Sequence, residues 1–243
     1  MDYHHYREAL TETLAQSEVP FPAAEYQARL DKVRQAMTEQ GLDALLLTDP
    51  ADINYLTGYH TFEVSVHACL ICTQEKLVLQ VASIETGAAV VTARVDEIIG
   101  YRWENLDEII TPLADLLIPC KKIGIDGWSS GLRFGVIDAL MQTIGRERFS
   151  EAGALIDAIR IVKSPAELEM LQESARITAL GLETAVQSIR PGMTDNDIAA
   201  VGAKALLENG SEFMSLQPIV TSGHRIGVIH VNHKRRVIQP NEP

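Results

Sequence analysis

Hydrophobic and polar positions alternate along residues 22–126 in the way that successive helices and strands produce. A helical pattern over 24–40 ends at Gly41, and the apolar run 44–48 that follows it predicts a strand. The remaining predicted elements are strands at 66–73, 77–81, 95–99 and 122–126, a short segment at 53–58 after an Asp-Pro turn, and helices near 84–93, 105–117 and 131–144. This order of elements predicts an α/β domain of about 130 residues, a usual size for one core.

A different pattern begins at Ser164. The sequence Ser164-Pro165-Ala166-Glu167 is typical of a capping box with proline at the first helical position. One face of the long helix that follows is mostly apolar, and we expect it to be packed: Leu168, Leu171, Ala175, Thr178, Leu182, Ala185 and Ile189. After Arg190-Pro191-Gly192 a second helix is predicted from Thr194 to Leu207, followed by strands at 216–221 and 228–231.

The change of pattern near residue 160 predicts two domains. A polar N-terminal arm over 1–24 precedes the α/β domain, which we expect over 25–160, and a second domain is expected over 161–243. With 243 residues and 46% hydrophobic content, the chain is long enough to bury one large core or two modest ones.

The negative net charge of the chain disfavours some classes of binding partner. A formal net charge of −12 disfavours nucleic acid and anionic membranes, because binding to phosphates needs a concentrated positive field. Small partners, cationic or zwitterionic, fit better. The chain contains no apolar run of about 18 residues, and the start Met1-Asp2-Tyr3-His4-His5 is unlike a signal peptide, so we expect a cytoplasmic protein.

Three cysteines, Cys69, Cys72 and Cys120, do not form a disulfide framework. The spacing Cys69-x-x-Cys72 resembles half of a zinc site or a redox pair. However, the surrounding residues are typical of a buried strand, in which side chains three positions apart point to opposite faces. We therefore interpret both as core thiols.

Four motifs in order along the chain carry a family resemblance. Residues 50–58 (Pro-Ala-Asp-Ile-Asn-Tyr-Leu-Thr-Gly) resemble a signature of the creatinase-type N-terminal domain, and residues 159–168 resemble the Arg-x-x-Lys-Ser-Pro junction into the pita-bread catalytic domain. Residues 190–194 match that domain's Arg-Pro-Gly-Met-Thr turn, and His230 follows Ser222-Gly223 at the spacing seen there. Together these motifs identify the chain as similar to the pita-bread metallopeptidase superfamily of aminopeptidase P, prolidase and creatinase-like hydrolases.

The resemblance implies a fold and a cofactor requirement. It implies a creatinase-type N-terminal α/β domain, a mixed sheet with flanking helices, followed by an incomplete pita-bread α+β domain. Asp52 stands where the family has Asn, and Asn241-Glu242 stand where Gly-Asp is usual. The family's ligands for two divalent ions (Mn, Co or Zn) lie beyond this turn, so we expect no metal in this chain and an inactive N-terminal portion of a longer enzyme.

Candidate site residues follow from the resemblance. The histidine matching His230 contacts the scissile carbonyl or a developing charge beside the metals, so His230 is the candidate catalytic electrophile or proton donor. His224 and Arg225 are candidates for lining a substrate pocket, with an ordinary loop as the alternative. His233 is a further substrate-binding candidate, although a surface position is the simpler interpretation. Phe62 is a candidate because creatinase-type enzymes place a Phe and an Arg in the corresponding loop to hold a carboxylate.

Other polar residues have structural roles in our interpretation, as a solvated turn or as helix caps. Lys234-Arg235-Arg236 reads as a solvated turn, since the run is short and no aromatic residues interleave with it. Asp195 and Asp197 are explained by helix capping. Neither group predicts a metal site.

Several functions remain open. The first is a Xaa-Pro aminopeptidase or dipeptidase that needs two metals; the second is a creatinase-like amidohydrolase; the third is an ectoine-type hydrolase. A fourth, from another class, is a non-catalytic peptide-binding pita-bread protein. Creatine itself is disfavoured, because residues 59–68 contain Phe62 but no Arg. The expected substrate is a small peptide or amide, and the resemblance implies a homodimer.

Overall fold

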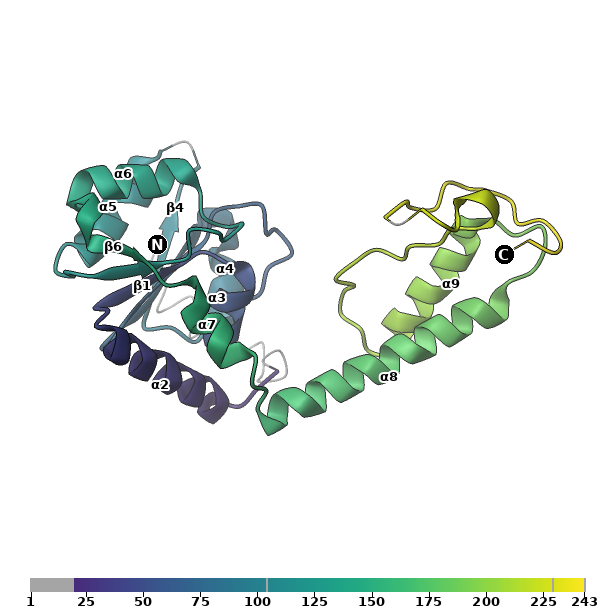
Figure 1. The fold of residues 1–243 in the computed structure, drawn as a ribbon, viewed down its shortest axis with the longest axis horizontal. Helices are drawn as coiled ribbons and strands as arrows, with labels where there is room; N and C mark the ends of the chain where they lie inside the picture. The colour runs from purple at the N-terminus through teal and green to yellow at the C-terminus, as the bar shows by residue number, and fades with distance from the viewer. Residues whose placement is uncertain (1–19, 104, 229, 243) are drawn as a thin grey trace. The chain divides into compact units, whose positions relative to one another are not determined.

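The computed structural model describes residues 20–103, 105–228 and 230–242. The chain divides between Val162 and Lys163 into two compact units, called unit 1 and unit 2 below (Figure 1). None of the helices in these ranges is both long and apolar enough to span a bilayer. The predicted N-terminal arm over 1–24 lies almost entirely outside the described residues.

Unit 1 contains a mixed six-stranded sheet in the order β4-β3-β2-β1-β5-β6. The pairs β1–β5, β5–β6 and β3–β4 are parallel, and β2 runs antiparallel to both β1 and β3. The strand bounds are β1 Ala44–Leu47, β2 Cys69–Thr73, β3 Leu77–Ala82, β4 Glu97–Tyr101, β5 Ile123–Ile125 and β6 Phe149–Glu151. The expected mixed sheet with flanking helices is confirmed.

Helices cover both faces of this sheet (Figure 1). Leu45 and Leu47 of β1 pack in one core with helices α2, α3 and α7, whereas Leu46 packs in a second core with α5 and α6. Alternate residues of one strand thus contribute to opposite cores, as the pleat requires. The helix bounds are α2 Ala23–Gln40, α3 Pro50–Thr57, the 3-10 turn η2 Ser83–Glu85, α4 Thr86–Thr92, α5 Asp107–Leu117, α6 Phe134–Ile144, the 3-10 turn η3 Arg146–Arg148 and α7 Gly153–Arg160.

The side chains of the two cysteines of β2 also point to opposite faces of the sheet. Cys69 is fully buried in the core under α5 and α6, and Cys72 is fully buried in the core under α2 and α3. Burial raises the pKa of the Cys72 thiol to about 11, which keeps it protonated. The interpretation as core thiols is confirmed.

Several boundaries in unit 1 differ from the prediction. The strand predicted over 66–73 begins only at Cys69. Residues 53–57 belong to helix α3, and Gly58 is its C-cap. Asp49 caps the start of this helix by accepting hydrogen bonds from the backbone N–H groups of Ala51 and Asp52. The prediction also missed β6 and α7. Strand β6 has only three residues, too few for a periodic signal.

Unit 2 is built on two helices, α8 Pro165–Ser188 and α9 Asp195–Glu208. Each begins with a capping box, Ser164 with Glu167 and Thr194 with Asp197, as the sequence predicted for α8. The helices pack closely at Gly181, where an added Cβ would lie 2.5 Å from the Leu206 side chain. Small residues at this crossing therefore set the distance between α8 and α9.

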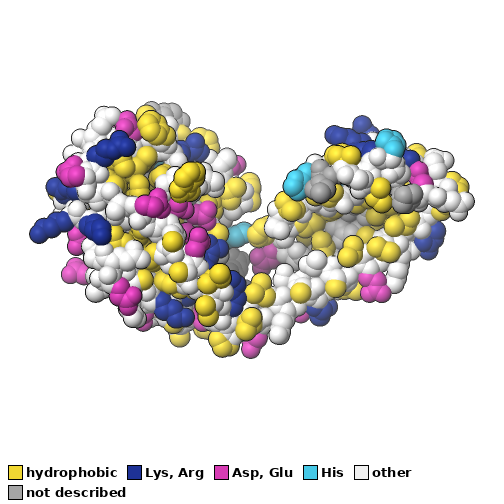
Figure 2. Space-filling view, viewed as in Figure 1, with side chains coloured by type: hydrophobic (Ala, Val, Ile, Leu, Met, Phe, Trp, Pro, Cys, Tyr) yellow, Lys and Arg dark blue, Asp and Glu magenta, His cyan; other side chains and the backbone are white. Residues whose placement is uncertain are grey.

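The predicted packing of α8 is wrong for most of the apolar face. Leu168 is 49% exposed, Leu171 51% and Leu182 66%, while the buried residues of the helix are Ile177 and Gly181. The helix α9 covers only one flank of α8. Figure 2 shows hydrophobic side chains at the surface of unit 2.

Both strands predicted after α9 are also wrong. None of the described residues in 209–242 belongs to a strand, and the ordered features there are a 3-10 turn, η4 Gly223–Arg225, and one isolated bridge between Thr194 and Val237. His230 has φ +62°, which a strand does not allow. The backbone N–H and C=O groups of a strand form hydrogen bonds with a neighbouring strand. In this segment side chains are hydrogen-bond partners of backbone groups instead.

Candidate functional site

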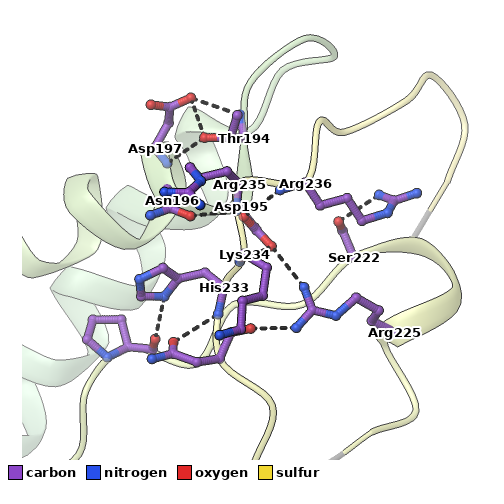
Figure 3. Close-up of polar contacts among 12 residues, drawn as sticks. Thr194, Asp195, Asn196, Asp197, Ser222, Arg225, His233, Lys234, Arg235 and Arg236 are labelled. Atoms are coloured by element: carbon purple, nitrogen blue, oxygen red, sulfur yellow. Dashed lines mark hydrogen bonds and ion pairs between the residues drawn. The ribbon is translucent and has the colours of Figure 1, made fainter.

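The buried carboxylate of Asp195 organises the polar contacts of unit 2 (Figure 3). Asp195 is the first residue of α9 and is fully buried. Its Oδ2 accepts a hydrogen bond of 3.0 Å from the backbone N–H of Lys234, and its Oδ1 accepts one of 3.0 Å from the backbone N–H of Arg236. One side chain thus anchors a segment that lies about forty positions further along the chain.

Backbone contacts reinforce this anchor. The N–H of Asp195 donates to the carbonyl of Arg236 at 3.0 Å, and the N–H of Ile238 donates to the carbonyl of Met193 at 2.8 Å. The Asn196 side-chain oxygen accepts a hydrogen bond of 2.7 Å from the N–H of Arg235. The turn before α9 and the segment 234–238 therefore form a short, ladder-like pairing.

Burial alone would raise the pKa of Asp195, but the backbone N–H groups of Lys234, Arg236 and Asn196 and the charge of Arg225 outweigh it. The net effect holds the pKa of this carboxyl below its ordinary value. Asp195 is therefore an ionised anchor at neutral pH and not a proton donor or acceptor for a reaction.

Arg225 and His233 are brought together by this arrangement (Figure 3). Arg225 lies 3.4 Å from the Asp195 carboxylate and donates to the carbonyl of Asn232 at 2.5 Å. The backbone N–H of His233 donates to the Asn232 side chain at 2.9 Å, and its ring Nδ1 lies 3.3 Å from the carbonyl of Pro218. Both candidates thus hold the loop together in this structure.

Arg236 makes a second anchor. Its guanidinium donates to the Ser222 hydroxyl at 2.8 Å and pairs with both carboxylate oxygens of Glu242. The hydrogen bonds from Arg236 and from the backbone of Gln239 lower the pKa of Glu242 to about 2. The interpretation of 234–236 as a solvated turn is therefore wrong for Arg236, whose guanidinium is part-buried and bonded.

The two other histidine candidates point into solvent. His224, in η4, is exposed, and its charge contributes to the low pKa of Glu242. His230 is also exposed, has a left-handed backbone, and has no side-chain hydrogen bond to any residue that the structure describes. Its imidazole is therefore available to a ligand.

Phe62 belongs to unit 1, in the loop that leads from α3 to β2, and is 92% exposed. The loop itself is held by hydrogen bonds. The Thr61 hydroxyl donates to Glu85 at 2.6 Å, and the backbone N–H of Glu63 donates to the Thr61 hydroxyl at 3.0 Å. An ordered loop thus presents an exposed aromatic ring.

Three carboxylates of unit 2 near this loop are already engaged. Asp195 accepts from backbone N–H groups, Asp197 caps α9, and Glu242 pairs with Arg236. The described residues contain no cluster of three or more His, Cys, Asp or Glu side chains suited to a metal. These residues do not fit a two-metal centre, so no catalytic step can be assigned to a metal held by them.

Sequence reasoning missed the main role of Asp195, because an acidic residue at a helix start already has a local explanation. A signal was nevertheless present. Thr194 and Asp197 suffice for the capping box, which leaves Asp195 without a local function on the buried side of the helix.

Comparison with known proteins agrees with this organisation. The Creatinase/Prolidase N-terminal domain family matches residues 29–162, and Metallopeptidase family M24 matches residues 169–243. The chain is 24% identical to the ectoine hydrolase of Halomonas elongata, over 90% of this chain and 60% of that protein, and 22% identical to the Xaa-Pro dipeptidase of Pyrococcus furiosus, over 83% and 54%.

A solved structure extends the likeness to the fold. The prolidase from Pyrococcus horikoshii OT3 aligns with a TM-score of 0.73 at 21% identity, over 88% of this chain and 58% of that one. The chain thus spans little more than half the length of these relatives. It belongs to the pita-bread M24 superfamily, with a Creatinase/Prolidase N-terminal domain over residues 29–162 and part of the metallopeptidase domain over residues 169–243.

Proposed function

We propose that this chain is the N-terminal portion of a Xaa-Pro dipeptidase-like or aminopeptidase-like hydrolase. The observation that carries the proposal is the order of the two family matches, 29–162 and then 169–243, with His230 exposed and unengaged inside the second match. The likeness to a Xaa-Pro dipeptidase supports the substrate class, a small peptide with proline at its second position.

In this proposal His230 donates a hydrogen bond to the oxygen on which negative charge develops during hydrolysis. An imidazole suits that role because its ordinary pKa lies near neutrality. His224, with Arg225 and His233 as its fixed neighbours, lies on the same loop and contributes to substrate binding. Arg225 and His233 act as positioning residues, since both hold the loop through Asn232.

In this proposal the metal ligands come from outside the residues that the structure describes. Two divalent ions, Mn, Co or Zn, would supply an activated water and polarise the carbonyl when bound. The carboxylates in the described part of the chain form no site for them, so the chain alone is expected to be inactive. A homodimer is the proposed assembly, with Phe62 as a candidate contact to substrate.

The test combines intact mass with an assay. Protein from its natural source is expected to exceed 26.7 kDa, the mass of this chain, and to hydrolyse a Xaa-Pro dipeptide only with added Mn, Co or Zn. His230→Gln is expected to lower kcat by about 10²–10³. His224→Gln is the matched control, because that histidine is equally exposed, and it is expected to change KM more than kcat. A natural mass of 26.7 kDa without hydrolysis would contradict the proposal.

A second candidate is supported by the likeness to an ectoine hydrolase, which covers 90% of this chain. The same preparation assayed with ectoine separates the two. Turnover of ectoine without turnover of the dipeptide would replace the peptidase proposal by a small-molecule amidohydrolase. Binding of peptides without turnover of either substrate would favour the non-catalytic alternative.

A further inference from the structure

Several loops of unit 1 meet at one edge of its sheet. Strands β1, β3, β4 and β5 end at this edge, and the loop 58–68 enters β2 there, since β2 runs in the opposite direction. The carboxyl edge of parallel strands is the usual place for ligand binding in open α/β sheets. Unit 1 therefore has a natural location for a site of its own.

His67 lies at this edge and is buried without polar partners. Its side chain is 6% exposed, and neither ring nitrogen has a hydrogen-bond partner among the residues that the structure describes. A buried imidazole ordinarily forms at least one hydrogen bond, because an unpaired polar atom in the interior loses its hydrogen bonds to water without replacement. The two nitrogens therefore indicate a missing partner.

Two neighbours from other segments face His67. Tyr101, at the end of β4, donates its hydroxyl proton to the His67 carbonyl at 2.7 Å, and the two ring centroids lie 6.1 Å apart. Arg133, immediately before α6, donates to the carbonyl of Ser65 in the loop, and its charge acts on both the His67 ring and Tyr101. Three separate segments thus place a cation, an imidazole and a phenol together.

Arg133 is only partly used. Its guanidinium is exposed, and it forms no ion pair with any described carboxylate. A guanidinium fork binds a carboxylate through two parallel hydrogen bonds between opposite charges, whereas the Ser65 carbonyl offers it one neutral acceptor atom. A carboxylate is therefore a better partner for Arg133 than the Ser65 carbonyl.

We propose that Arg133 and His67 form a binding site for a small monocarboxylate at the carboxyl edge of the unit 1 sheet. The carboxylate replaces the Ser65 carbonyl on Arg133, which releases the turn 63–66, and the imidazole of His67 then reaches the second oxygen. A single fork and one imidazole match one planar, singly charged group. The site lies within unit 1 and does not depend on the proposed hydrolase activity.

Ligand binding is linked to proton uptake from solvent. In the free protein, burial and the charge of Arg133 lower the pKa of His67 to about 4, so the ring is neutral. A bound carboxylate partly neutralises Arg133 and favours the imidazolium. Two carboxylates lie near this group: Glu85, whose charge acts on Tyr101, and Glu63, which accepts from the Ser65 N–H. Asp49, Arg102 and Asp126 follow the ends of β1, β4 and β5 at the same edge.

The experiment follows the imidazole of His67 by NMR in the histidine-labelled chain, at about pH 6 in a buffer free of carboxylate. The His67 signal is identified by its loss in His67→Gln. Titration with sodium acetate is expected to shift this signal saturably toward the imidazolium position, whereas sodium chloride at equal ionic strength does not. Arg133→Gln is expected to weaken acetate binding by at least about tenfold.

Arg148→Gln is the matched control. Arg148 also donates to backbone carbonyls of unit 1, those of Ile118 and Cys120, but its charge does not act on His67. It is expected to leave acetate binding unchanged. Equal weakening by both substitutions would overturn the proposal. A His67 signal that does not shift with acetate would also overturn the proposal and would indicate that water is the partner of the ring nitrogens. Saturation of the shift by inorganic phosphate and not by acetate would overturn it too.

Discussion

The two units differ in how far they bury the apolar residues that their sequences supply. In unit 1, helices on both faces of the sheet enclose side chains such as Leu79 and Leu117, which are fully buried. In unit 2, α8 leaves Leu182 66% exposed, although its pattern is that of a packed helix. The difference shows that a helical pattern specifies which face is apolar, while burial depends on a partner that the pattern does not name.

Loss of a core side chain tests this comparison with the largest expected effect. Leu113→Ala in α5 removes a side chain that is 1% exposed in the core under α5 and α6. It is expected to lower the free energy of unfolding of unit 1 by about 2–5 kcal/mol, because the cavity cannot collapse fully. The loss of unfolding free energy is measured by urea denaturation, with amide exchange in β2 and β3 as the probe of unit 1. A loss below about 1 kcal/mol would mean that unit 1 is less closely packed than described.

Acidification is the next largest effect and acts on unit 1. The pKa of His67 is about 4 in the folded chain, below its ordinary value of 6.5, so the unfolded state binds the proton more tightly. The contribution of His67 to the free energy of unfolding is therefore fully present above pH 6.5. It is lost as the pH decreases from 6.5 toward 4, and the loss is about 3 kcal/mol.

The measurement compares urea unfolding of the natural chain and His67→Gln at several values of pH, in a buffer without carboxylate. Carboxyl groups titrate in both proteins, so the difference between the two curves isolates His67. Parallel curves would show that the ring is not held in its neutral form.

The success of sequence reasoning depended on whether a residue's role was local. The capping box at Ser164 and the opposite faces of Cys69 and Cys72 follow from chemistry within a few positions, and the structure confirms them. Asp195 looked like a capping residue, yet its carboxylate binds backbone groups of Lys234 and Arg236. A contact between residues about forty positions apart produces no periodic pattern in the sequence. The loop after α9 depends on such contacts, and its short apolar runs alone predicted strands.

The anchor at Asp195 is expected to have an intermediate effect. Asp195→Asn keeps the shape of the side chain but removes its charge and one acceptor, so a backbone donor and Arg225 lose a buried partner. The pairing of α9 with the segment 234–238 is expected to weaken by about 1–3 kcal/mol. Amide exchange at Lys234 and Arg236 measures the change directly.

Asp197→Asn serves as the control for that experiment. It alters the capping box with Thr194 and leaves the contacts to 234–236 in place. Faster exchange is then expected in the first turn of α9 and not at Lys234. If both substitutions accelerate exchange at Lys234 equally, the anchor is the helix start itself and not the buried carboxylate.

The smallest expected effect is on the exposed face of α8. Leu182→Ser replaces a side chain that is 66% exposed, so the free energy of unfolding of this chain should change by less than about 0.5 kcal/mol, in contrast to Leu113→Ala in unit 1. Amide exchange across α8 measures this change. The same substitution in the longer protein proposed above sharpens the comparison: a further M24 segment packed on this face would raise the loss to about 2 kcal/mol or more, because Leu182 would then be a core residue. An equally small effect in both proteins would mean that this face of α8 stays in solvent.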